Sequence, residues 1–245
     1  MGTQRPFKPI TRSKVLVVEG QDEKNLFSKL ITCLDLPDIE IRDIGGKTKF
    51  RRNIKTLTIT SGYDRVTSVG IVTDADKQPQ GAFDSICDAL EAAGLPRPTA
   101  PLRPTGDDPQ VAVMILPGDG REGMLEDLYL ESVADDPVMP CLEEHFRCLE
   151  EQLEAGAFPG NPSKAIVRTF LASMEWLEEA HFEYLQKRMG EYLPELPNAP
   201  SVAKVHTFLA SRYKPDLDLG IAAKKGYWRL DHPAFAQVKQ FLSTL

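Results

Sequence analysis

The sequence predicts an α/β fold, a mostly parallel sheet of at least four strands with flanking helices, followed by an all-helical region. Short apolar runs alternate with amphipathic helical patterns up to about residue 135, which is the pattern of successive β-α-β units. Beyond about residue 136 we find no run typical of a strand, and the periodic segments are helical. We therefore expect an α/β domain over residues 1–135 and a helical region over 136–245.

Four runs have the composition of strands. The first is an apolar, β-branched run that ends in a carboxylate and a glycine, as expected of a fully buried strand in a parallel sheet. The second alternates apolar and polar residues and ends at a glycine pair. In order, the predicted strands are residues 14–19, 39–44, 67–73 and 111–116.

Apolar residues at helical spacing predict the connecting helices. The first begins with acids, which suit the positive end of the helix dipole, and we expect it to end before Pro37. Within the α/β part the others are about 49–60, a helix around 83–90 that ends at Gly94, and one that begins near 123. In the helical region they are 141–155, 162–177, 181–193, 202–212 and 233–245.

The charge is acidic overall but segregated. The chain of 245 residues has a net charge of −7, and a polyanion is a poor non-specific binder of nucleic acid. Residues 47–55 nevertheless hold five basic residues and no acid, and residues 204–229 are also mainly basic. Basic faces could therefore still meet a phosphate chain.

The sequence also indicates a compartment. No apolar stretch approaches the roughly 20 residues that cross a bilayer. Residues 1–13 lack the apolar core of a signal peptide, so we expect a cytoplasmic protein without a membrane partner. The four cysteines form no CxxC pair, and reduced, structural thiols are expected.

Carboxylates follow two of the predicted strands. Glu19 ends the first strand, and Asp74 and Asp76 follow the third. Open α/β sheets bind ligands at the carboxyl ends of their strands. If these strands are neighbours, three carboxylates meet at one edge, and a bound divalent cation, most simply Mg²⁺, is the usual remedy for their repulsion.

This constellation, Val-Val-Glu-Gly after one strand and Asp-x-Asp after another, resembles the toprim domain. That domain occurs in topoisomerases, bacterial primases, recombination-mediator proteins and nucleases of the overcoming-lysogenisation-defect (OLD) family. The resemblance covers about residues 13–135. Three further segments resemble a small uncharacterised family of stand-alone toprim proteins with a helical tail: residues 116–119, 123–127 and 225–228.

The resemblance implies a metal-dependent phosphoryl transfer on nucleic acid, as in a nuclease or nickase, with Mg²⁺ or Mn²⁺ as cofactor. The Asp pair would bind the metal, and Glu19 would act as general acid or base or bind a second metal. Asp22, Glu126 and Asp127 are the further candidate ligands, although acids in a first helical turn equally suit the dipole.

Basic residues provide the candidate phosphate contacts, although a solvated helix face would look the same. We expect a basic segment of the helical region to lie beside the acids. The candidates are Lys47, Lys49, Arg51, Arg52, Lys204, Lys224 and Lys225. Trp228 with Tyr227 fits packing better than base stacking.

The same residues are also compatible with other functions. A haloacid-dehalogenase-like phosphatase also carries Asp-x-Asp after a strand, but Gln78 replaces its usual threonine. A glycosyltransferase could use Asp-x-Asp but would not require Glu19-Gly20. A catalytically idle toprim module that binds nucleic acid or a protein is the main alternative. The chain has no P-loop, so an ATPase partner would be a separate chain.

Overall fold

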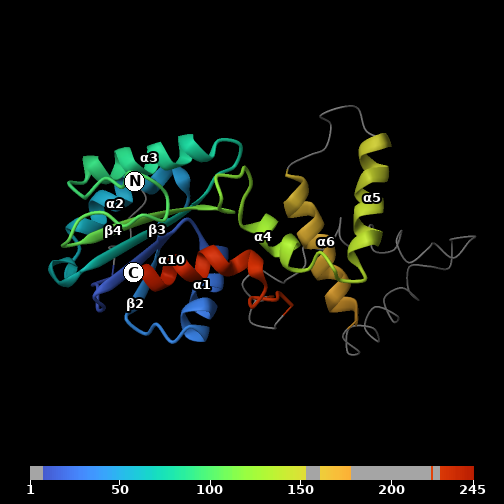
Figure 1. Ribbon diagram of the computed structural model, residues 1–245, viewed down its shortest axis with the longest axis horizontal. Helices are drawn as coiled ribbons and strands as arrows, with labels where there is room; N and C mark the ends of the chain where they lie inside the picture. The colour runs from blue at the N-terminus through green and yellow to red at the C-terminus, as the bar shows by residue number, and fades with distance from the viewer. Residues whose placement is uncertain (1–7, 153–160, 178–221, 223–226) are drawn as a thin grey trace, which may run out of the picture. The chain divides into compact units, whose positions relative to one another are not determined.

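The computed structural model describes residues 8–152, 161–177, 222 and 227–245. The α/β prediction is confirmed: a parallel sheet of four strands is flanked by helices (Figure 1). The chain divides into two compact units, residues 1–128 with 230–245, and residues 129–229. The boundary near residue 136 between an α/β domain and a helical region stays a prediction.

The sheet has the order β2-β1-β3-β4, and all neighbouring pairs are parallel. Its strands are β1 (Lys14–Val18), β2 (Ile39–Asp43), β3 (Ser68–Asp74) and β4 (Gln110–Leu116). The registers align Val15 of β1 with Glu40 of β2 and with Val69 of β3. Parallel pairing places the carboxyl ends of all four strands at one edge.

Helices cover both faces of the sheet. Figure 1 shows α2 (Phe50–Thr58) and α3 (Pro79–Ala92) on one face and α1 (Gln21–Cys33) and α10 (Ala236–Thr244) on the other. On the α2/α3 face, Val15, Ile71 and Val113 pack in one buried cluster with helix residues such as Ile54. Burial on both faces explains why the middle residues of β1, β3 and β4 are apolar.

Helix limits differ slightly from those predicted. α1 ends at Cys33 rather than near Pro37, because Asp35 has a left-handed φ of 52° that an α-helix cannot contain. α3 begins at Pro79, four residues before Phe83, since proline suits the first helical turn. The short 3₁₀ helix η1 (Lys47–Lys49) precedes α2, and η2 (Tyr63–Arg65) follows it.

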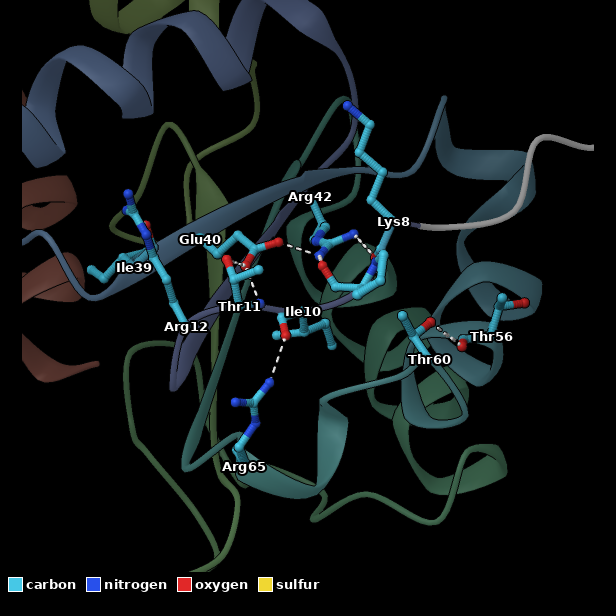
Figure 2. A network of polar contacts seen from close by, with 11 residues as sticks. Lys8, Ile10, Thr11, Arg12, Ile39, Glu40, Arg42, Thr56, Thr60 and Arg65 are labelled. Carbon is cyan, nitrogen blue, oxygen red and sulfur yellow. Dashed lines mark hydrogen bonds and ion pairs between the residues drawn. The ribbon is translucent and has the colours of Figure 1, made fainter.

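The segment before β1 is fastened to β2 (Figure 2). The guanidinium of Arg42 donates to the main-chain oxygens of Lys8 and Pro9, at 2.6 and 2.8 Å, and pairs with Glu40. Both the main-chain N–H and the hydroxyl of Thr11 donate to the Glu40 carboxylate, at 2.8 and 2.9 Å. These bonds hold Ile10 in the core of the α2/α3 face, where it is buried.

The second unit is helical where it is described. It contains α5 (Met139–Gln152) and α6 (Pro162–Leu177), close to their predicted limits. Trp228 is buried and stacks on Tyr129 and Phe170, with ring centroids 4.4 and 5.5 Å away. Trp228 therefore packs, as the sequence favoured. The helices expected at 181–193 and 202–212 lie outside the described residues.

The closing amphipathic helix belongs to the first unit. It consists of η3 (Pro233–Phe235) and α10, and its apolar residues Val238, Phe241 and Leu242 are buried. Leu245 follows α10 and reaches the middle of β3. The first unit thus combines residues from the beginning and from the end of the sequence.

Candidate functional site

The carboxyl ends of β1 and β3 form the switch point of the sheet. These two strands are neighbours, but the chain leaves β1 into α1 on one face and leaves β3 into α3 on the other. In open parallel sheets the crevice between two such strands is where ligands bind. Glu19 directly follows β1 and Asp74 is the last residue of β3, so both are at this crevice.

Glu19 and Asp74 are in direct contact. Oε1 of Glu19 accepts a hydrogen bond from the main-chain N–H of Asp74 at 3.1 Å and another from the hydroxyl of Thr73. Oδ1 of Asp74 in turn accepts from the main-chain N–H of Leu125 at 3.0 Å. Leu125 begins α4 (Leu125–Ser132), so the positive end of a helix faces the Asp74 carboxylate.

Asp76 stands at the rim of the same crevice. Its side chain is 54 % exposed, and its φ of 50° lies in the left-handed region that aspartate tolerates. An isolated antiparallel bridge joins it to Gly123: each main-chain N–H donates to the other's oxygen, at 2.8 and 2.7 Å. This bridge fixes the turn after β3 against the segment that leads into α4.

Lys47 reaches into the acids from η1. Its ammonium donates to Oδ2 of Asp76 at 2.5 Å and to the main-chain oxygen of Asp74 at 2.9 Å, and lies 3.8 Å from Oε1 of Glu19. The sequence suggested Lys47 as a phosphate contact. In the structure its partners are the predicted catalytic acids.

Further acids begin the two helices at this edge. Glu23 accepts from the N–H of Gly20 at 3.0 Å, and Asp127 accepts from the N–H of Met124 at 2.7 Å, both in the geometry of a capping box. Glu126 is buried at 8 % exposure. Asp22 is half-buried in the first turn of α1.

The electrostatics are those of crowded carboxylates. Burial is the main cause that raises the pKa of Asp74 to about 8, and the charges of Glu19, Glu23 and Glu126 add to it, while Lys47 opposes them. Burial, followed by the nearby charges of Glu19 and Asp22, also raises the pKa of Glu23. For Asp74, the effects of burial and of these three carboxylates on the pKa thus outweigh that of the Lys47 ammonium.

The predicted basic residues fall into two groups. Lys49, Arg51 and Arg52 are exposed around the start of α2, the end of that helix nearest to Lys47. Lys204, Lys224 and Lys225 lie outside the described residues, so their expected position beside the acids stays a prediction.

Sequence reasoning missed Glu23 and Thr73. A signal for Glu23 was present, since it lies one helical turn after Glu19 and three residues after the turn glycine that precedes α1, as a capping-box acid does. Thr73 gave no separate signal, because a threonine in a buried strand is ordinary. Its role follows only from the pairing of β1 with β3.

These acids have the right chemistry for a hard cation but are not arranged around one. Across residues 8–152, 161–177, 222 and 227–245, no three His, Cys, Asp or Glu side chains are gathered in a geometry that could hold a metal ion. The contacts above explain this, because Glu19 and Asp74 are turned toward main-chain donors and Lys47 lies between the carboxylates. Carboxylate oxygens remain the ligands that Mg²⁺ and Mn²⁺ prefer, so the donor set fits such an ion.

Comparisons with known proteins give one family match. The model of a family described as "Protein of unknown function (DUF3226)" matches residues 13–196. No curated protein matches the chain. Among the described residues, no helix has both the length and the apolar character needed to cross a membrane.

Two similar solved structures are both of the C-terminal region of the OLD protein of Xanthomonas campestris pv. campestris, one phased with iodine and one with platinum. The first is 15 % identical, with a TM-score of 0.34, and the match covers 95 % of this chain and 97 % of that one. The second is 14 % identical, with a TM-score of 0.33, and the match covers 95 % of each chain.

Proposed function

For this chain, which belongs to the DUF3226 family of proteins of unknown function, we propose a metal-dependent phosphoryl transfer on nucleic acid, with cleavage or nicking of the phosphodiester chain as the reaction. The observation that carries the proposal is the contact between Glu19 and Asp74 at the switch point of the sheet, where burial and further carboxylates raise the pKa of Asp74.

Glu19, Asp74 and Asp76 are the proposed ligands of Mg²⁺ or Mn²⁺. Glu126, Asp127 and Asp22 stay candidates for a second position, and Glu23 joins them because its charge acts on Asp74. When bound, such an ion stabilises the charge that develops on a phosphodiester oxygen. Glu19 is also the proposed general acid or base, as the toprim resemblance implies.

The chain's own residues would bind and orient the phosphate chain. Lys49, Arg51 and Arg52 are exposed near Lys47, on the side of the crevice where α2 begins. These three cations can locally offset the repulsion between an acidic protein and the phosphates of nucleic acid. The affinity for nucleic acid should then fall steeply as the salt concentration rises. We propose DNA or RNA as the partner, and any ATPase as a separate chain.

A catalytically idle module that binds nucleic acid or a protein is the second candidate. One observation favours it: Lys47 already provides a cation to Asp76 and to the Asp74 carbonyl. A module of this kind would need no metal, whereas the phosphoryl-transfer function requires that an ion enter the crevice.

The test is cleavage of labelled single- and double-stranded DNA and RNA in Mn²⁺ or Mg²⁺. We expect Glu19→Gln to lower the cleavage rate by roughly 100-fold or more, a typical loss for a general acid or base, without unfolding, because the glutamine oxygen can still accept from Asp74 and Thr73. Glu91→Gln is the matched control, since Glu91 is exposed near the end of α3, remote from the carboxyl edge. It should cleave like the wild type.

Cleavage that survives in Glu19→Gln would exclude this site as the active one. Metal binding without cleavage of any of the four substrates would favour the idle binding module. Absence of both metal binding and cleavage would remove the phosphoryl-transfer proposal.

A further inference from the structure

Lys47 occupies a position at which oxygens of three crevice residues converge. Its ammonium touches Asp76 and the Asp74 carbonyl oxygen, and it lies within ion-pair distance of Glu19. These oxygens come from two different strand ends, and Lys47 itself comes from the segment after a third strand, β2. The side chain thus closes the crevice from the β2 side.

An ammonium and a divalent cation cannot both occupy this position. The carboxylates that Lys47 approaches belong to the same set that a metal at Glu19, Asp74 and Asp76 would use. Like charges separated by one carboxylate group repel strongly in a partly buried crevice, where water screens them incompletely. Each cation therefore lowers the affinity of the crevice for the other.

The lysine side chain can leave while its backbone stays. The N–H of Gly46 donates to the main-chain oxygen of Glu19 at 2.8 Å, which ties the loop to the site. Gly45 and Gly46 turn the chain there, with φ values of 71° and 102° that favour glycine. The Lys47 side chain is 40 % exposed and flexible, so it can turn outward.

We propose that Lys47 is an internal counter-ion that competes with the divalent cation and is displaced when the ion binds, which frees its ammonium for a phosphate of the substrate. This inference rests on the proposed metal-dependent function. It reconciles the acidic crevice with the absence of a formed metal geometry among the described residues. It also couples the metal and the phosphate, because the ion releases a cation at the rim of the crevice.

The first test is Mn²⁺ binding, followed by electron paramagnetic resonance and by the metal-induced shift in melting temperature. We expect Lys47→Met to bind Mn²⁺ roughly tenfold more tightly than the wild type, the factor that applies if the ammonium fills the crevice about 90 % of the time. The control is Lys29→Met, which removes one positive charge from the second half of α1. It should leave the Mn²⁺ affinity unchanged. Lys47→Gln is the alternative variant should Lys47→Met not fold.

The second test uses the unmodified protein. Acetylation of lysines by a dilute amine-reactive reagent, read by mass spectrometry, should label Lys47 several-fold faster with saturating Mg²⁺ than in chelator. The labelling of Lys29 should not change between the two conditions.

The outcomes distinguish a failure of the counter-ion role of Lys47 from a failure of the proposed metal-dependent function. Equal or weaker Mn²⁺ binding by Lys47→Met, or Lys47 labelling that does not rise although Mg²⁺ binds, would overturn the counter-ion role and leave the metal site standing. If the wild type binds no divalent ion, the proposed function fails, and the role of Lys47 fails with it.

Discussion

Asp74 is the residue at which stability and the proposed function conflict. It is 8 % exposed, and three further carboxylates act on it through space. A buried charge that is not fully compensated destabilises a folded protein. Proteins retain such groups where a site needs them, so their replacement often stabilises the fold at the expense of function.

Asp74→Asn should therefore stabilise the metal-free protein and abolish its response to metal. Asparagine can still accept from the N–H of Leu125, and it has no carboxyl group that must either carry a charge or bind a proton in this buried crevice. We expect a gain on the order of 1 kcal/mol in the free energy of unfolding in chelator, which raises the melting temperature by roughly 2–4 °C. The measurement is a thermal melt in chelator and again in Mn²⁺.

Asp64→Asn is the control, because Asp64 is exposed in η2, before β3, at the opposite edge of the sheet. It should change neither the melting temperature nor the metal response. A loss of stability for Asp74→Asn in chelator would contradict the crowding of charge at this position.

The sequence predicts the ends of strands well and side-chain partners poorly. Glu19 and Asp74 could be placed together because a buried strand ends at each, and parallel strands end at one edge. Lys47 could not be placed, because its contact with Asp76 depends on the turn geometry of Gly45 and Gly46, which composition alone does not specify. Predicting side-chain pairs of this kind, which are distant in sequence, requires the three-dimensional structure.

At the level of elements, the segment before β1 depends on one edge strand. β2 is at the margin of the sheet, and its residues Glu40 and Arg42 provide the bonds that hold Lys8 to Thr11 (Figure 2). Nε of Arg42 is buried and has no hydrogen-bond partner among the described residues. The pairing with Glu40 is therefore the main charge compensation shown for this guanidinium.

Glu40→Gln should weaken this edge in a pH-dependent way. Burial alone would raise the pKa of Glu40, but hydrogen bonds from Thr11 and the charge of Arg42 outweigh burial and lower it below 4.5. A lowered acid pKa contributes stability above pH 4.5 that is lost as the pH falls through the folded value. We expect Glu40→Gln to cost about 1 kcal/mol at about pH 7, because the group is partly exposed, and little at about pH 3.

Urea unfolding at about pH 7, 5 and 3, on either side of the carboxyl titration, would measure this difference. Glu91→Gln is the matched control, because Glu91 pairs with Arg97 at 3.2 Å on the surface and such pairs contribute little. A deficit for Glu40→Gln that stays the same at all three pH values would show that ionisation of Glu40 does not stabilise the edge.

Element limits show where local signals suffice. β1 to β4 lie within one or two residues of their predicted limits, because apolar composition and flanking turns define a buried strand. The end of α1 and the start of α3 were less accurate. A left-handed residue and a proline in the first turn decide those limits, and neither interrupts the apolar periodicity.

At the level of the whole molecule, the first unit is discontinuous in sequence. The chain leaves it after Leu128 and returns at Leu230. The sequence predicted the amphipathic helix at 233–245 and placed it in a helical region that packs on the α/β core. Periodicity identifies an apolar face without saying which surface that face covers, and α10 packs against the sheet.

Leu245 shows how close this packing is. It is buried, and a Cβ placed on Gly70 in β3 would lie 2.6 Å from its Cδ1 and 3.1 Å from Cδ1 of Leu16. Real contacts of a Cβ are longer, so Gly70→Ala should overpack this contact and cost roughly 1–3 kcal/mol. Leu245→Ala should cost roughly 2 kcal/mol, the low end for a buried leucine, since a residue after the last helical turn can relax.

The two changes should not be additive, because each relieves the consequence of the other. The methyl group that Gly70→Ala introduces would fill part of the space that the Leu245 side chain leaves, so the double variant should be more stable than the sum of the single variants implies, by about 1 kcal/mol. Unfolding measurements on the four proteins give this coupling directly. The same cycle with Val238→Ala, seven residues earlier and also buried on α10, should be close to additive. Additivity for Gly70 and Leu245 would mean that α10 does not hold Leu245 against β3 in solution, and that this face of the sheet is covered in another way.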